Sequence, residues 1–157
     1  MRLQWGFMLN DPRMTNSTFI EGYSGNGSLH YAPYSNDARV SHSHGWSTGP
    51  TYALTHYTAG LKIHDAAGVE WSIVPQPGDL EYVNAGITTN RGKFAIQWAK
   101  ERNSTHYRSL TFSTPGGTQG SVKLPGVQGK LVAQYGAQIP LRNGEASGLS
   151  GGVWKLA

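Results

Sequence analysis

The sequence predicts a mainly β protein, an antiparallel β-sandwich preceded by a short segment of helix and loop. Turn-forming residues are abundant, with 21 Gly and 8 Pro among 157 residues, and this favours short strands over a helical bundle. From Lys62 onward apolar and polar residues alternate with period two, and Gly- or Pro-containing turns separate the alternating stretches. Helical spacing of apolar residues comes earlier in the chain. We therefore expect a helical and loop segment at residues 1–61 and a sandwich at residues 62–157.

The first part contains two predicted helices. Met1–Leu9 has apolar residues at helical spacing, and Asn10-Asp11-Pro12 ends it because the residue before a proline is pushed out of the helical region. Ser41–Leu61 is the longer one. Ser47 and Thr48 offer capping hydroxyls, Pro50 suits the first turn, and Gly60 permits a left-handed end. Its apolar stripe is Ala53, Leu54, Tyr57 and Leu61.

A long loop, Asn16–Val40, joins these helices and is rich in Gly, Ser, Asn and Tyr. Loops of this length are usually disordered or functional, and the aromatic residues here argue against disorder. Glu21 stands among aromatic neighbours. It is either a surface charge or a carboxylate whose pKa is tuned by apolar surroundings.

The second part reads as a series of short strands. A hairpin turn is predicted at Asn90-Arg91-Gly92. Alternation places Phe94, Ile96 and Trp98 on one inward face and Leu110 with Phe112 on another. The predicted strands are Val69–Val74, Leu80–Ala85, Ile87–Thr89, Lys93–Lys100, His106–Ser113, Gly120–Leu124, Lys130–Tyr135 and Val153–Leu156.

Composition limits the classes of partner. The net charge of +4 comes from scattered Lys and Arg without a basic run, so we expect no nucleic-acid partner. No stretch has the apolar length of a membrane span. The sequons at Asn16, Asn26 and Asn103 favour a secreted, extracellular glycoprotein whose targeting signal lies upstream of this chain. No cluster of His and carboxylates has ligand-like spacing, so no metal and no cofactor is expected.

Four blocks of sequence carry a family resemblance. They are RLQWGFMLN at Arg2–Asn10, TFIEGY at Thr18–Tyr23, SHSHGWSTGPT at Ser41–Thr51 and PQPGDL at Pro75–Leu80. Their order and spacing resemble the C-terminal portion of fungal α-L-rhamnosidases of glycoside hydrolase family 78. The resemblance implies that residues 1–61 are the last helices and active-site loop of an (α/α)₆ barrel, and that residues 62–157 are the C-terminal sandwich.

The same resemblance implies roles for individual residues. These glycosidases invert configuration, with one carboxylic acid protonating the leaving oxygen and one carboxylate activating water. Glu21 lies where the family has its general base, and His44 matches a histidine that contacts the sugar. Trp46, Tyr23 or Tyr31 would provide an apolar platform for a sugar face, although Trp46 also suits a core position.

The family's general acid lies upstream of the matching region, so this chain lacks it. We therefore expect a C-terminal segment of an inverting glycosidase that acts on terminal rhamnosides and is inactive alone. Its partners would be a rhamnose-containing glycan and the remainder of the barrel, or a second copy of the chain if it stands alone. Two other readings stay open: a non-catalytic, lectin-like carbohydrate-binding sandwich, and a structural buttress for a barrel.

Overall fold

A computed structural model describes residues 3–157 and divides the chain into two compact units, Met1–Tyr52 and Ala53–Ala157. The division falls inside the second helical segment, whereas we expected the boundary after Leu61. Met1 and Arg2, which belong to the predicted first helix and to the first sequence block, lie outside the described residues. Among the described residues, no helix is long and apolar enough to cross a membrane.

The first unit is mostly loop packed around a small core. Helix α1 (Gln4–Asn10) ends as predicted, because Asp11 before Pro12 is extended. Aromatic side chains of the loop pack against the buried Met8, Met14, Ile20 and Val40. Short 3-10 turns, η1 (Asp37–Arg39) and η2 (Gly45–Ser47), are the other regular elements before the second helix.

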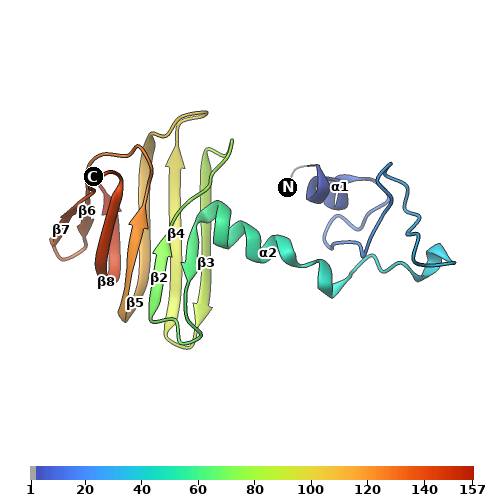
Figure 1. Cartoon of the computed structure of the whole chain (residues 1–157), viewed down its shortest axis with the longest axis horizontal. Helices are drawn as coiled ribbons and strands as arrows, with labels where there is room; N and C mark the ends of the chain where they lie inside the picture. The colour runs from blue at the N-terminus through green and yellow to red at the C-terminus, as the bar shows by residue number, and fades with distance from the viewer. Residues whose placement is uncertain (1–2) are drawn as a thin grey trace. The chain divides into compact units, whose positions relative to one another are not determined.

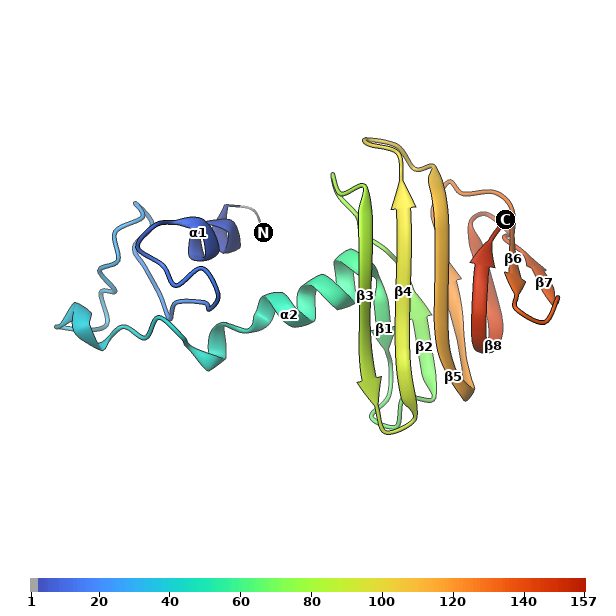
Figure 2. The ribbon, with the colours of Figure 1, turned by 180° about the vertical axis from the view of Figure 1, so that it is seen from behind.

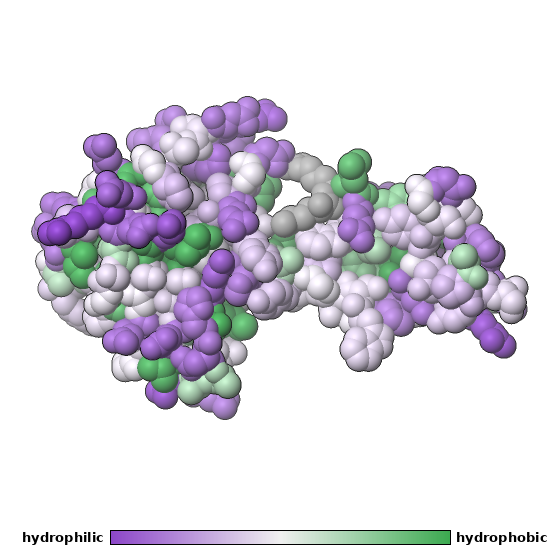
Figure 3. All heavy atoms as spheres, viewed as in Figure 1, coloured by the Kyte–Doolittle hydropathy of each residue, from purple (hydrophilic) through white to green (hydrophobic). Residues whose placement is uncertain are grey.

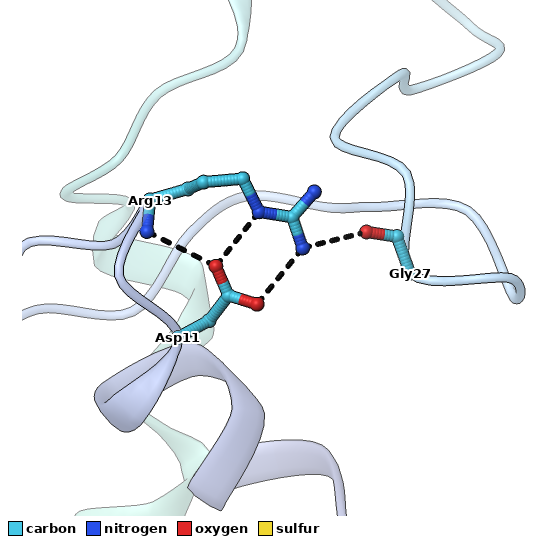
Figure 4. A network of polar contacts seen from close by, with 3 residues as sticks. All are labelled: Asp11, Arg13 and Gly27. Atoms are coloured by element: carbon cyan, nitrogen blue, oxygen red, sulfur yellow. Dashed lines mark hydrogen bonds and ion pairs between the residues drawn. The ribbon is translucent and has the colours of Figure 1, made fainter.

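An ion pair between Arg13 and Asp11 links the end of α1 to the loop at Gly27 (Figure 4). The Arg13 guanidinium donates two hydrogen bonds to the Asp11 carboxylate, at 2.7 and 2.8 Å, and a third to the Gly27 carbonyl at 3.1 Å. The hydrogen bonds from Arg13 lower the pKa of Asp11 to about 2. The carboxylate is thereby kept ionised and in place.

The second helical segment is shorter than predicted. It consists of α2 (Gly49–Ala53) and a π-helical stretch, η3 (Leu54–Ala59), and Gly60 ends it in a left-handed conformation, as expected. Ser41–His44 is excluded from the helix because its backbone pairs with Phe19–Glu21. Leu61 begins a strand, and Leu54 and Tyr57 of the expected apolar stripe are exposed.

The second unit is mainly β, which confirms the predicted fold class. Two strands were missed, β1 and β7, and β5 and β8 are longer than predicted. The strands are β1 (Leu61–Ile63), β2 (Glu70–Ile73), β3 (Tyr82–Thr89), β4 (Gly92–Lys100), β5 (Tyr107–Lys123), β6 (Lys130–Ala133), β7 (Gln138–Pro140) and β8 (Glu145–Leu156). The hairpin turn between β3 and β4 is present, with Thr89 opposite Gly92.

The eight strands form one hydrogen-bonded sheet that folds over into two facing layers (Figures 1 and 2). The first half of β5 pairs with β4, whereas its second half pairs with β2. The β5–β8 register shifts between Thr114 and Gln119. Pro115-Gly116-Gly117 therefore marks the crossing between layers, where we expected a loop. The β2–β5 pair is parallel, so the sheet is mixed and the expectation of a purely antiparallel sandwich is corrected.

The core lies between the two layers. Phe94, Ile96 and Trp98 of β4 are at most 1% exposed, as the alternation predicts, and so are Leu110 and Phe112 of β5. The facing layer contributes Trp71 and Ile73 of β2, and the rings of Trp71 and Phe112 meet edge to face at 5.5 Å.

Candidate functional site

Two segments distant in sequence lie side by side in the first unit. The Glu21 N–H donates to the Ser41 carbonyl at 2.8 Å, and the His44 N–H donates to the Phe19 carbonyl at 2.9 Å. Two hydroxyls reinforce the pairing: Thr18 donates to the His42 carbonyl at 2.6 Å and Ser47 to the Ile20 carbonyl at 3.0 Å. The backbone pairing brings the side chains of Glu21 and His44 together.

The Glu21 carboxylate is held by two donors. The Tyr34 hydroxyl donates to Oε1, and the Ser41 N–H donates to Oε2 at 3.1 Å. The hydrogen bond from Tyr34, followed by that from Ser41, lowers the pKa of Glu21, although burial acts in the opposite direction. The side chain is 13% exposed. Glu21 is thus a shielded carboxylate whose pKa is lowered by hydrogen bonds, and not by the apolar surroundings that the sequence reading considered.

His44 lies beside this carboxylate. Its Nδ1 is 3.8 Å from Oε2 of Glu21, and its side chain is 25% exposed. This distance is too long for a hydrogen bond but short enough for charge interaction. The His44 ring therefore has nitrogen atoms left to bond a ligand beside the carboxylate.

The predicted aromatic platforms differ in exposure, and Tyr31, like Tyr23, packs against the small core of the first unit. Tyr23 packs on Phe7, with ring centroids 4.6 Å apart, and belongs to the small core of the first unit. Trp46 is 92% exposed, so the core reading of this side chain is wrong and its ring is free to contact a ligand. Sequence reasoning did not assign Tyr34 or Ser41 to the site. The aromatic richness of the loop was the one signal that pointed toward Tyr34.

The other acidic side chains of the first unit are each paired with a basic side chain. They are Asp11, bound to Arg13, and Asp37, whose Oδ1 lies 2.7 Å from Nδ1 of His30. Inverting glycosidases need two carboxyl groups roughly 6.5–9.5 Å apart, one of them an acid. Within residues 3–157, no group of three or more His, Asp or Glu side chains is placed to hold a metal ion. The arrangement therefore supplies one shielded carboxylate with an imidazole beside it.

All three sequon asparagines are exposed. Asn16 and Asn103 have left-handed backbones, with φ of 61° and 53°. The Asn16 amide also donates to the Leu9 carbonyl at 2.8 Å. Asn103 lies in the connection between β4 and β5, which the side chain of Lys100 holds by donating to the carbonyls of Glu101 and Ser104.

Comparison with known proteins gives two kinds of similarity. Residues 60–137 match the family model of the bacterial alpha-L-rhamnosidase C-terminal domain. The α-L-rhamnosidase from Dictyoglumus thermophilum has a similar fold, with 19% identity and a TM-score of 0.54 over 74% of this chain. The Streptomyces avermitilis α-L-rhamnosidase complexed with L-rhamnose also has a similar fold, with 18% identity and a TM-score of 0.59 over 85% of this chain.

The chain spans 14% of the first of these structures and 13% of the second. At these identities the structural likeness shows a shared fold. A search of curated proteins finds no sequence match. The family match begins at the end of the helical segment and covers most of the strands, so it supports a rhamnosidase-related protein. It does not reach Glu21 or His44, whose roles stay predictions.

Proposed function

We propose that this chain is the C-terminal part of an inverting α-L-rhamnosidase of glycoside hydrolase family 78. The domain match at residues 60–137 supports the assignment of the sandwich, and the four sequence blocks support that of residues 1–61 and favour a fungal member. The small share of each rhamnosidase structure that the chain spans supports a longer parent protein. A terminal rhamnoside is the proposed substrate of that parent.

In this proposal Glu21 is the general base. A base must be ionised at the working pH and must hold a water molecule within hydrogen-bond reach. The hydrogen bonds from Tyr34 and Ser41 keep Glu21 ionised and fix its orientation, while each carboxylate oxygen retains a lone-pair direction for water. This anchored carboxylate is the observation that carries the proposal.

His44 and Trp46 would position the sugar. The His44 ring, near Oε2 of Glu21, would exchange hydrogen bonds with sugar hydroxyls, and the exposed Trp46 ring would cover an apolar sugar face. The general acid would come from the remainder of the parent, because the other acids of the first unit are paired.

Release of rhamnose from an aryl α-L-rhamnoside tests this proposal. We expect the parent protein to release rhamnose and the 157-residue chain alone to release none. The native protein should also have a mass well above 17.0 kDa. A native protein of 17.0 kDa, or turnover by the chain alone, would contradict the proposal.

The alternative is a non-catalytic carbohydrate-binding protein, and the exposure of Trp46 favours it. In that case the chain alone would bind rhamnose-containing glycans, the parent would show no hydrolysis, and Trp46→Ala would abolish binding. Titration of the chain with L-rhamnose, followed by tryptophan fluorescence and NMR, separates the two functions.

We also propose that the parent is secreted and glycosylated. The exposure of Asn16, Asn26 and Asn103 leaves each sequon accessible, and Asn103 in its polar connection is the best acceptor. Peptide mass spectrometry of protein from the natural source should find a glycan on Asn103. Three unmodified sequons would remove the support for secretion.

A further inference from the structure

We propose that the outer face of the β1–β2–β5–β8 layer carries a second binding site, which takes a saccharide bearing a carboxylate group. The site lies wholly in the second unit, away in sequence from Glu21 and His44. It is a cavity of about 810 Å³ whose lining includes His64, Ser72, Ser121, Lys123 and Arg142. Ligand pockets typically measure roughly 300–1,000 Å³, so the space suits a few sugar rings.

Small side chains make the floor of this cavity. Ser72 of β2 pairs with Ser121 of β5, and Ser147 of β8 lies on the next strand of the same layer. Because strands are spaced about 4.8 Å apart, these residues form a polar row across the sheet. The Oγ atoms of Ser121 and Ser147 make no hydrogen bond within residues 3–157, so their hydroxyls are available to a ligand rich in hydroxyls.

A row of three charges makes one wall. The tight turn at Asn143-Gly144 brings the backbone of Arg142 opposite that of Glu145. On the other side, Glu145 of β8 is the register partner of Lys123 on β5. Directly paired residues share a face of the sheet, so all three side chains project from the outer face. Glu145 lies 2.6 Å from the Lys123 ammonium. Among the described residues, Arg142 has no side-chain partner, which leaves one uncompensated cation beside the row of serines.

The uncompensated guanidinium selects the class of ligand. Arginine binds carboxylates through two parallel, charge-assisted hydrogen bonds, whereas a neutral sugar offers only uncharged hydroxyl acceptors, which bind a guanidinium more weakly. Val74, Ile139 and Pro140 are among the apolar residues of the lining, and such an area suits the C–H face of a sugar ring. In Figure 3 the face of the sandwich turned to the viewer shows hydrophilic residues around smaller hydrophobic areas.

Titration of the chain with a β-1,4-linked glucuronic acid trimer tests the inference, with cellotriose as the neutral counterpart. We expect the acidic trimer to shift NMR signals of Ser121, Ser147 and Arg142, and cellotriose to bind at least about tenfold more weakly, the value of one lost charge-assisted contact. Equal binding of both trimers, or binding of neither, would overturn the inference.

Two variants locate the site. Arg142→Gln should weaken binding of the acidic trimer about tenfold, and Ser121→Tyr should block it by filling the floor. Arg108→Gln is the matched control, because Arg108 is also exposed but lines a different cavity. An equal loss in Arg108→Gln would mean non-specific attraction to a basic protein and would overturn the inference. Neither result depends on rhamnoside hydrolysis, so the inference and the proposed function can fail separately.

Discussion

The Nδ1 atom of His44 lies 3.8 Å from Oε2 of Glu21, although a long loop separates the two residues in sequence. The contact exists because Ser41–His44 leaves the helical path and pairs with Phe19–Glu21. The Glu21 carboxylate and the His44 imidazole, the proposed base and the proposed sugar contact, are thereby held on neighbouring segments. Backbone hydrogen bonds fix the separation of these two groups before any ligand arrives.

Tyr34→Phe should raise the pKa of Glu21 toward its ordinary value. The Tyr34 hydroxyl is the largest cause of the lowered pKa, and phenylalanine keeps the ring while removing the donor. Carboxyl ¹³C NMR shifts of Glu21 across a pH titration measure the change. Tyr31→Phe is the control, since the Tyr31 ring meets Tyr34 edge to face but is not bonded to Glu21. An unchanged Glu21 titration in Tyr34→Phe would show that the hydrogen bond is absent in solution.

The lowered pKa of Glu21 also predicts how the first unit responds to acid. A carboxylate with a lowered folded-state pKa adds stability above its unfolded pKa, and this stability is lost as pH falls through the folded value. The Ser41 amide, which donates to the Glu21 carboxylate, should therefore become less protected against hydrogen exchange below pH 4.5, the ordinary pKa of glutamate. Amide hydrogen exchange measured at descending pH checks this, and protection that persists at pH 2 would contradict it.

The raised pKa of Tyr107 predicts how the stability of the sandwich changes at alkaline pH. Burial beside Trp98 raises the pKa of Tyr107 to about 12, against an ordinary value of 10.0. The folded state therefore prefers the neutral phenol, and its stability should fall as pH rises from 10 toward 12. Tyr107→Phe should flatten that fall in urea unfolding curves, whereas Tyr135→Phe, at an exposed position, should not. If the stability of wild type and of Tyr107→Phe fell equally between pH 10 and 12, the raised pKa of Tyr107 would be contradicted.

Gly120→Ala should destabilise the sandwich by about 1–3 kcal/mol. A Cβ atom at Gly120 would overlap the ring and the backbone oxygen of Trp71, and neither can move without disturbing the core. Gly116→Ala is the matched control on the same strand, because a Cβ atom there meets open space. Equal denaturation midpoints for the two variants would mean that β2 and β5 pack less closely than described.

His44→Ala in the parent protein should raise KM and lower kcat/KM for an aryl α-L-rhamnoside, because a contact to sugar hydroxyls is lost in both ground and transition states. His42→Ala is the control, two residues earlier on the same extended segment. If both histidine variants behave as wild type, His44 has no part in sugar binding.

Much of the sandwich could be predicted from the sequence because its core obeys a strict two-residue period. The alternation of Phe94, Ile96 and Trp98 placed all three side chains inside, and Gly92 closed the hairpin as expected. Pro115-Gly116-Gly117 misled the strand assignment. Turn-forming residues end most strands, but here they let β5 cross between layers, and the long-range pairing with β8 keeps the strand continuous.

The candidate site was harder to predict than the core. Glu21 and His44 came from a family resemblance, and no local pattern shows that their segments pair. Tyr34 escaped assignment because a donor to a carboxylate is defined by tertiary contact and has no fixed spacing in sequence. Trp46 shows the opposite difficulty, since composition alone cannot tell an exposed indole from a buried one.

The kcat of a Glu21→Gln variant of the parent protein tests the assignment of the general base most directly. Glutamine keeps the shape of glutamate but cannot accept a proton from water, so kcat should fall about 10²–10⁴-fold while KM changes little. Azide needs no deprotonation, so adding it should restore turnover and yield rhamnosyl azide of inverted configuration. A kcat equal to that of wild type, with no effect of azide, would show that Glu21 is not the base.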